Sequence, residues 1–283
     1  MIAVQILIIL LVGAGLTVAG SQGGAVYGAL PVFAICAVLA FAIQWLAFIP
    51  AAILKTERFY DLTGSLTYLT VAGVAYALGN GSGRAVLLGF LVAIWAIRLG
   101  TFLALRVHRD GFDRRFNRIK NALGMFFMTW TLQGLWVLFT VSCALAAMTS
   151  ETVEPLGGWA VVGTLVWLAG FGIEAAADEQ KRQFRKDPAN QGQFISSGLW
   201  AWSRHPNYFG EIALWIGIAC IAFPVLQGWQ LLTLASPLFV YVLLTRISGI
   251  NMLERRADKA WGEDAGYEAY KARTPVLVPR PPL

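Results

Sequence analysis

The chain has 283 residues, of which 57% are hydrophobic and only 13% are charged, and its formal net charge is +6. A soluble domain carries about 25% charged residues, so this composition excludes a soluble globular protein and indicates a polytopic integral membrane protein. The apolar runs have the length of about 20 residues that a spanning helix needs, and they lack the alternation of spanning strands.

Eight apolar runs predict an all-α fold, a polytopic membrane helical bundle of seven or eight transmembrane helices. The runs cover residues 3–20, 28–54, 62–79, 84–106, 122–148, 157–177, 208–225 and 229–249. The third run contains Thr63, Ser65 and Thr67 and is unusually polar, so we expect it to face other helices or a cavity. Residues 1–20 have no basic start and no cleavage site, which favours a retained helix over a signal peptide.

Basic residues orient this bundle. Residues 106–120 hold six Arg or Lys and residues 178–204 hold five, whereas the other connections between runs hold few. By the positive-inside rule, both basic loops and the C-terminus are cytoplasmic, and the side of the N-terminus depends on the number of spans. We therefore expect the polar side chains of these loops to face the cytoplasm.

The loops between the runs are too short to fold independently, so we expect a single integral membrane domain over residues 1–283. Its tail, 275–283, is rich in proline; it cannot be helical, and we expect it to be disordered or to lie on the surface. Cys36, Cys143 and Cys220 lie in separate apolar runs without the spacing of metal ligands, so neither a disulfide framework nor a metal site is indicated.

The first polar block follows the run 157–177. Asp178, Lys181, Arg182 and Arg185 are spaced i, i+3, i+4 and i+7, so they share one face of a helix. One guanidinium group can bind two phosphate oxygens at once. A stripe of such groups at a cavity mouth therefore suits a phosphate-bearing ligand. The alternative is a stripe that extends to the membrane surface and contacts lipid phosphates.

The second block is the run from Arg204 and His205 through Pro206 to Asn207, Tyr208 and Glu211. Proline is well tolerated in the first helical turn, so Pro206 is expected to begin a helix. Asn207 and Glu211 then stand one turn apart near its N-terminus. An amide and a carboxylate there can bind a carboxamide or ribose hydroxyls, and the helix end favours phosphate.

A third block begins at Arg246, at the end of an apolar run. Asn251 and Glu254 follow, on an amphipathic helix that we expect to continue through Trp261 to Tyr270. Two interpretations are compatible: the helix lies on the inner leaflet, or it closes a cofactor pocket.

The strings Arg-His-Pro-Asn-Tyr-Phe-Gly-Glu (204–211) and Ser-Gly-Ile-Asn-Met-Leu-Glu (248–254) resemble the bacterial membrane branch of the steroid 5α-reductase superfamily, which is related to the sterol C14/C7 reductases. The resemblance covers residues 90–280 and is specific over 170–215, whereas the helices of residues 1–80 are divergent. It implies an NADPH-dependent 3-oxo-5α-steroid 4-dehydrogenase-like oxidoreductase of a bacterial inner membrane, with its cofactor site facing the cytoplasm. Such an enzyme reduces the carbon–carbon double bond of a lipid-like enone, such as a 3-oxo-Δ4-steroid.

The resemblance also implies a set of cofactor-binding residues. Family counterparts around the dinucleotide are Asp178, Arg182, Arg185, Asn207, Glu211 and Arg246. The same motifs add Arg204, His205, Tyr208, Asn251 and Glu254, and further basic positions match Arg98 and Lys120. We expect a monomer that contacts membrane lipid and a lipid-like substrate and binds no nucleic acid.

Reduction of an enone needs a hydride at the β-carbon, an acid that polarises the carbonyl, and a proton for the α-carbon. In the family a carboxylate and a tyrosine in early helices hold the ketone. The candidates here are Glu57, Tyr60, Asp61, Tyr68 and Trp95, the last where the family tyrosine falls. Asp61 is favoured, because a carboxyl group held against apolar surroundings can donate a hydrogen bond. Alternatively, Asp61 is a solvated residue paired with Lys55 or Arg58.

Two other function classes compete. Isoprenylcysteine and phospholipid methyltransferases share an Arg-His-Pro-x-Tyr motif, but they follow it with paired acids, whereas Glu254 here is a single acid followed by two arginines. A transporter or lipid-binding scaffold would place charges at mid-span, whereas the ionisable groups here gather at one face. The chain has no Gly-x-Gly-x-x-Gly turn after a strand, so helices and loops must hold any dinucleotide.

Overall fold

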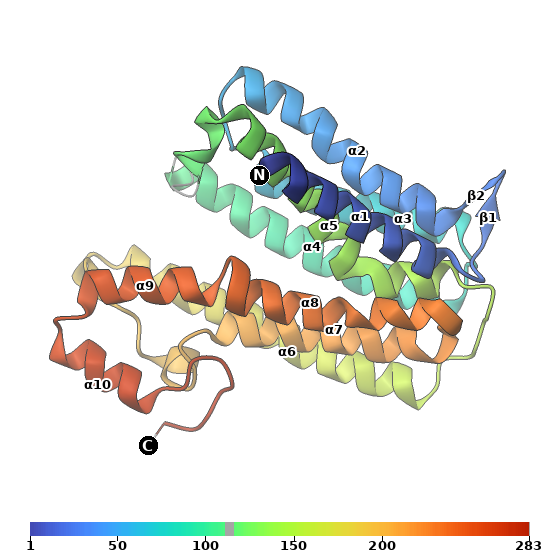
Figure 1. Cartoon of the computed structure of the whole chain (residues 1–283). Coiled ribbons are helices and arrows are strands. Elements are labelled where there is room, and N and C mark those ends of the chain that lie inside the picture. Colours follow the sequence, from blue (N-terminus) through green and yellow to red (C-terminus); the bar gives the residue numbers. More distant parts are fainter. Residues whose placement is uncertain (111–115, 283) are drawn as a thin grey trace. The chain divides into compact units, whose positions relative to one another are not determined.

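The computed structural model describes residues 1–110 and 116–282, and of residues 106–110 it describes the backbone only. The chain is a helical bundle that forms two compact units (Figure 1). The first comprises Met1–Ala160 and Ala219–Ser236, and the second Val161–Ile218 and Pro237–Leu283. Within the described residues, seven helical segments are long and apolar enough to cross a membrane, which indicates an integral membrane protein.

The first unit is built around α5. Its elements are α1 (Ile2–Ser21), the hairpin of β1 (Val26–Tyr27) and β2 (Leu30–Pro31), α2 (Val32–Ile53), α3 (Tyr60–Leu78), α4 (Gly83–Asp110), the 3₁₀ turn η2 (Ile119–Asn121) and α5 (Leu123–Thr149). Helix α5 packs against α1, α2, α3 and α4 and is the most buried of the apolar helices. The predicted run 28–54 becomes helical only at Val32, because Gly28 turns the hairpin with a φ of +64° and Pro31 precedes the helix.

Helix α3 carries the polar run, and it is not among the seven apolar helices. Thr63, Ser65 and Thr67 are nevertheless buried, as predicted for a helix that faces its neighbours. Thr67 donates to the carbonyl of Thr63 four residues earlier, which satisfies its hydroxyl inside the helix. Gln44 Nε2 of α2 in turn donates to Thr67 Oγ1 over 2.7 Å. The prediction that residues 62–79 face other helices is confirmed for Thr63, Ser65 and Thr67, whereas Thr70 of the same run is exposed.

The second unit contains most of α6 (Gly158–Lys186) and of α7 (Pro206–Ala222), joined by the 3₁₀ turns η3 (Pro188–Asn190) and η4 (Gly198–Ala201). Glycines let α6 and α7 approach closely: a Cβ added at Gly210 would lie 2.5 Å from the carbonyl oxygen of Gly170. A Cβ at Gly217 would lie equally close, 2.5 Å from the oxygen of Gly163. Small residues at such a crossing are typical of helices packed in a membrane. This crossing fixes the first turns of α7 beside the end of α6.

The predicted run 229–249 is less regular than a single helix. It contains the 3₁₀ segment η6 (Gly228–Ala235), α8 (Ser236–Val242) and the π-helical turn η7 (Leu243–Ile247), followed by α9 (Ile250–Trp261). Pro237 has no amide hydrogen to continue a helical ladder at the start of α8. At the other end the amide of Ser248 donates to Leu243 O, five residues earlier, over 2.9 Å. A π turn often marks a functional position.

One expectation about the C-terminal part is wrong and another is confirmed. The amphipathic helix does not continue from Asn251 to Tyr270, because α9 ends at Trp261 and α10 (Ala265–Arg273) begins after Asp264, whose carboxylate caps it. The proline-rich tail is not helical and lies on the surface, as predicted: residues 275–282 are all exposed or half-buried. Its backbone accepts hydrogen bonds from Ser203 and Arg204.

The topology and the single-domain boundaries stay predictions. Of the basic residues used to orient the bundle, Arg114 and Arg115 lie outside the described residues, and the side chains of Arg106 and Arg109 are likewise not described.

Candidate functional site

In the second unit, the polar ends of α6 and α7 lie side by side. Asn207 Nδ2, in the first turn of α7, donates to Asp178 Oδ1 of α6 over 3.1 Å. Asp178 is buried and Asn207 is half-buried. The close approach at Gly170 and Gly210 brings these two side chains together. Both were selected from the sequence, and the structure joins them directly.

The turn before α7 is fixed to α6. The indole nitrogen of Trp200 donates to Ala177 O over 3.0 Å, and the amide of Leu199 donates to Gln180 Oε1 over 2.9 Å. Lys181 Nζ lies 4.2 Å from the centroid of the Trp200 ring, a cation–π contact. These contacts hold Lys181 on the face of α6 that also carries Asp178. Trp200 was not selected from the sequence; its place four residues before Arg204, in the turn that leads into the polar string, was the available signal.

Arg204 and His205 share one carboxylate. Arg204 Nη1 lies 2.7 Å from Glu254 Oε2, and His205 Nε2 lies 2.8 Å from Glu254 Oε1. Burial lowers the pKa of His205 below its ordinary value, and the opposing effects of the hydrogen bond and charge of Glu254 are smaller. His205 therefore stays neutral near pH 7 and donates or accepts according to its tautomer. Both oxygens of the Glu254 carboxylate are therefore engaged.

Tyr208 links this cluster to the π turn. Its ring stacks on that of His205, with centroids 5.7 Å apart and planes inclined by 15°. A Cβ added at Gly249 would lie 2.9 Å from Tyr208 Cε2, so only glycine allows this approach. The predicted residues Arg246 and Asn251 lie on either side: both are exposed, and Asn251 Nδ2 donates to Arg246 O over 3.3 Å.

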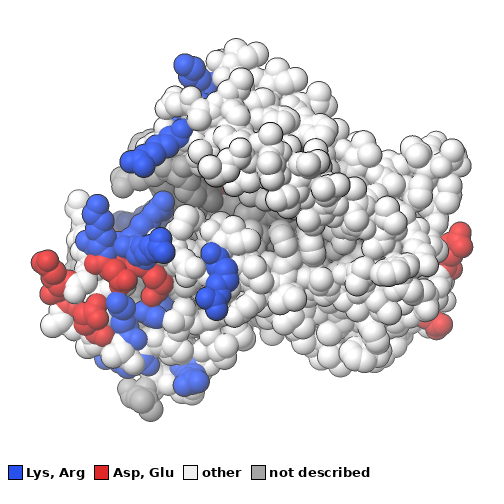
Figure 2. Space-filling view, in the orientation of Figure 1, with Lys and Arg blue, Asp and Glu red and all other residues white. Residues whose placement is uncertain are grey.

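The cations of α6 are arranged less uniformly than the predicted stripe. Arg182 forms a bidentate pair with Glu179, with Nε and Nη2 each 2.6 Å from a carboxylate oxygen. Arg185 is exposed in the following turn. Figure 2 shows the basic and acidic side chains of the second unit gathered near α9 and α10. The choice between a ligand phosphate and lipid phosphates stays open for these two arginines.

Two acids complete this polar region. Glu174 is 2% exposed and lies one turn before Asp178 on α6, where a Cβ at Gly210 would lie 2.6 Å from its amide nitrogen. Glu211, a predicted site residue, directly follows Gly210 in α7 and is half-buried. The sequence analysis missed Glu174 because it lies inside an apolar run. Its spacing of four residues from Asp178 was the signal that could have found it.

The catalytic candidates belong to the first unit, with Arg98 and Lys120. Lys120 Nζ lies 2.8 Å from Glu57 Oε2, and the Glu57 side chain is 2% exposed. Tyr60 donates its hydroxyl to Thr129 O over 3.1 Å. Three of these candidates therefore serve contacts that hold the start of α3 against η2 and α5. Asp61 follows in the first turn of α3, half-buried at the positive end of the helix dipole.

Tyr68 and Trp95 contact each other. Their rings meet edge to face, with centroids 5.0 Å apart and planes at 85°, and both residues are buried between α3 and α4. The tryptophan at the predicted tyrosine position therefore has a tyrosine beside it. Arg98, one turn further along α4, lies with its guanidinium carbon 5.5 Å from the centroid of Phe102.

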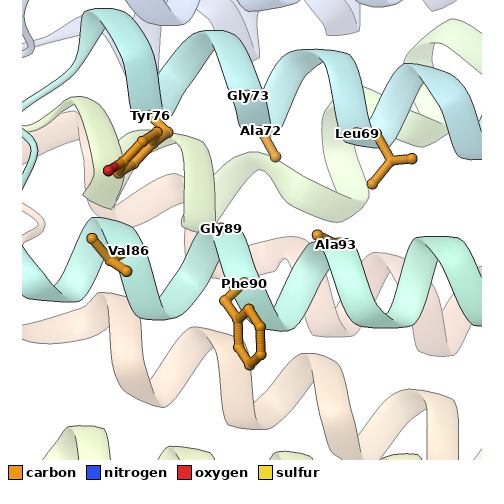
Figure 3. Close-up of a pocket in the computed structure, with 8 residues that line it drawn as sticks. All are labelled: Leu69, Ala72, Gly73, Tyr76, Val86, Gly89, Phe90 and Ala93. Atoms are coloured by element: carbon orange, nitrogen blue, oxygen red, sulfur yellow. The ribbon is translucent and has the colours of Figure 1, made fainter.

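An apolar groove of about 290 Å³ runs between α3 and α4. Figure 3 shows Tyr76 and Val86 at one end and Leu69 and Ala93 at the other. The full lining is Leu69, Ala72, Gly73, Tyr76, Val86, Gly89, Phe90 and Ala93. The hydroxyl of Tyr76 is the single polar side-chain group among them. The groove suits an apolar molecule.

Known proteins share this sequence pattern. The family model described as "Protein of unknown function (DUF1295)" matches residues 47–274. The chain is 24% identical over 206 residues to an uncharacterized protein of Schizosaccharomyces pombe, which covers 61% of this chain and 60% of that protein. It is 30% identical over 118 residues to the Delta(14)-sterol reductase of Arabidopsis thaliana, and this match covers 38% of this chain and 31% of that protein. It is 32% identical over 87 residues to the 3-oxo-5-alpha-steroid 4-dehydrogenase 1 of Bos taurus, and this match covers 30% of this chain and 32% of that protein.

These relatives confirm the resemblance to the steroid 5α-reductase superfamily that the motifs predicted. The chain spans 60% of the length of the first relative, and 31% and 32% of the two named reductases.

Proposed function

Because the chain belongs to the DUF1295 family, we propose that it is a membrane-embedded, NADPH-dependent reductase of the carbon–carbon double bond of a lipid-like enone, such as a 3-oxo-Δ4-steroid. The observation that carries this proposal is the hydrogen bond between Asn207 and Asp178, at the point where α6 turns basic. An amide and a carboxylate held together suit a carboxamide or ribose hydroxyls, and the cations that follow suit phosphates.

The residues of the second unit fit such a cofactor. Among the described residues, the buried Nε of Arg204 has no hydrogen-bond acceptor, although Nη1 of the same side chain faces Glu254. A buried donor of this kind is costly unless a ligand or water accepts from it. Lys181, Arg182 and Arg185 would hold the phosphates, while Asp178 and Asn207 would orient the rest of the molecule. When bound, NADPH supplies the hydride for the β-carbon of the enone.

For the carbonyl of the substrate, the proposal uses Asp61. A protonated carboxyl group donates a hydrogen bond to the carbonyl oxygen and so stabilises the negative charge that develops there. Tyr68 is the second candidate donor, since it lies beside Trp95, where the family places a tyrosine. The groove between α3 and α4 offers apolar walls to a flat lipid, which supports an apolar substrate class.

The methyltransferase alternative loses support from Glu254. A sulfonium cofactor carries positive charge and requires acids, but Arg204 and His205 occupy both oxygens of this carboxylate. The exposed neighbours Arg255 and Arg256 add further positive charge. This region therefore suits an anionic ligand better than a cationic one.

The test is cofactor binding and turnover by the purified protein in detergent or nanodiscs. NADPH should quench tryptophan fluorescence in a saturable manner, and NADPH should be oxidised when testosterone or progesterone is added. S-adenosylmethionine is the control ligand and should not bind. Saturable binding of S-adenosylmethionine without binding of NADPH would overturn the proposal in favour of the methyltransferase.

A further inference from the structure

The C-terminal segment Pro275–Arg280, here called the strap, is bonded to the turn Trp202–Arg204 that precedes α7. The amide of Arg204 donates to Pro275 O and the amide of Arg280 donates to Trp202 O, each over 2.9 Å. These two backbone bonds lie at the two ends of the strap. The strap therefore contacts the turn along its length and not at one point.

Ser203 lies at the centre of this contact and is fully buried. Its hydroxyl donates to Leu277 O over 2.9 Å, with Val276 O at 3.3 Å, and it accepts from the amide of His205 over 3.1 Å. One hydroxyl thus joins the strap to His205, the residue directly before α7. Since a buried hydroxyl with both donor and acceptor engaged is fixed in orientation, Ser203 transmits the position of the strap to His205.

Two other elements also support the turn, but they contact residues other than Ser203. Helix α9 holds Arg204 and His205 through Glu254, and α10 holds Trp200, whose carbonyl accepts from the hydroxyl of Tyr270 over 2.7 Å. The strap is the third support, and it is the one that contacts the residue between Trp202 and Arg204. Asn207 follows only four residues after Ser203.

We propose that the strap is a positioning element, and Ser203 a positioning residue, that sets the placement of Arg204, His205 and Asn207 for cofactor binding. The cofactor part of this inference rests on the proposed function, whereas the support of the turn does not. Loss of the strap should let the turn Trp202–Arg204 move and should weaken cofactor binding, while the helices of the second unit stay intact.

Arg280 offers a matched pair of substitutions. Arg280→Pro removes the amide that donates to Trp202, while Arg280→Ala removes the side chain and keeps this amide. A second pair is deletion of residues 275–283 against deletion of 281–283, which lie beyond the last of these hydrogen bonds. A third is Ser203→Ala against Ser197→Ala, whose side chain is exposed and makes no capping bond.

Two measurements decide the inference. Hydrogen exchange of peptides covering 203–210 should be faster in Arg280→Pro, Ser203→Ala and the longer deletion, and unchanged in the three controls. The dissociation constant for NADPH should rise on the order of tenfold in Arg280→Pro and Ser203→Ala, as the loss of one hydrogen bond predicts, and by more in the longer deletion, which removes all of these bonds. At saturating NADPH, turnover should return towards that of the unaltered protein.

The outcomes separate the two proposals. Unchanged exchange in Arg280→Pro and Ser203→Ala would overturn the strap, whatever the cofactor does. Faster exchange with an unchanged dissociation constant would overturn its positioning role. If the unaltered protein binds no NADPH, the proposed function fails, and faster exchange would still support the strap as the support of the turn.

Discussion

Polar side chains serve different purposes in the two units. In α3 of the first unit they are spread along the helix and are satisfied by close neighbours, as Thr67 is by Gln44. In α6 of the second unit they gather in the last turns, where Asp178 meets Asn207 and Lys181 covers Trp200. Scattered polar groups with local partners indicate structure, whereas concentrated groups of mixed charge at a helix end indicate a ligand. Changes in the first unit should therefore lower stability, and changes in the second should lower affinity.

Asp61 is the expected exception in the first unit and should show the largest effect. Asp61→Asn removes an acidic proton donor, and acid catalysis contributes roughly 10²–10⁴-fold to turnover. We expect kcat to fall by about that factor while the dissociation constant for NADPH stays within twofold. Tyr60→Phe is the control, since its hydroxyl serves Thr129 O and its loss should cost about 1 kcal/mol of stability alone. Unchanged kcat in Asp61→Asn would make Asp61 a structural residue like its neighbours.

Breaking the ion pair of Glu57 and Lys120 should lower the stability of the protein and leave NADPH binding unchanged. Lys120→Met leaves the buried Glu57 carboxylate without its ammonium group, and breaking a buried pair costs about 3 kcal/mol. The double variant Glu57→Gln/Lys120→Met should recover part of this loss. Thermal unfolding midpoints of the single and double variants measure the coupling. If Lys120→Met weakened NADPH binding without lowering the midpoint, Lys120 would belong to the cofactor site.

Sequence reasoning found the helices and most polar residues but not their pairing. The polar character of 62–79 was readable from its residue types, and Ser65, Thr67 and Thr70 each donate to a carbonyl four residues earlier in the same helix. The contact of Glu254 with His205 was not readable, because 49 residues separate them and the π turn sets the rotation of α9. The role of the tail was missed for a related reason: its contacts come from backbone groups, which the sequence does not distinguish.

Disturbing the crossing of α6 and α7 in the second unit should have the next largest effect. Gly210→Ala would place a methyl group 2.5 Å from Gly170 O, so α6 and α7 must separate. Overpacking of this kind costs about 2 kcal/mol, and the separation should also break the contact of Asn207 with Asp178. Gly172→Ala is the control, because no atom lies within 4 Å of its added Cβ. Equal midpoints and equal NADPH affinity in the two variants would contradict the role of the crossing.

Asn207 should separate affinity from stability most clearly. Asn207→Ala removes the amide that Asp178 accepts from, and we expect NADPH to bind about tenfold more weakly. The thermal midpoint should fall only by the amount that one lost hydrogen bond to Asp178 predicts, about 1 kcal/mol. Gln193→Ala, in the exposed loop after η3, is the control for a lost amide. Titration of tryptophan fluorescence with NADPH measures the difference, and equal affinity in the two variants would remove Asn207 from the site.

The smallest effect is the pH dependence that His205 gives to the second unit. Burial lowers the pKa of His205 in the folded protein, with Lys181 and Arg204 adding repulsion and Glu254 opposing it. In the unfolded chain histidine takes up its proton near pH 6.5, so below this pH the unfolded state binds more protons. The stability that neutral His205 contributes is complete above about pH 6.5 and is lost as the pH falls towards the lower pKa of the folded state.

His205→Gln keeps an amide that can reach Glu254 but removes the titration. The unfolding midpoint of the unaltered protein should therefore fall more between pH 7.5 and pH 5.5 than that of the variant. Carboxylates outside this cluster affect both proteins equally, and Glu254 keeps its partner Arg204 in both, so the difference between the two curves reports on His205 and its contact with Glu254. Parallel curves would show that Glu254 compensates fully for burial. In that event the cluster of Arg204, His205 and Glu254 would resemble the paired polar groups of α3, and the contrast between the two units would rest on Asp178 and Asn207 alone.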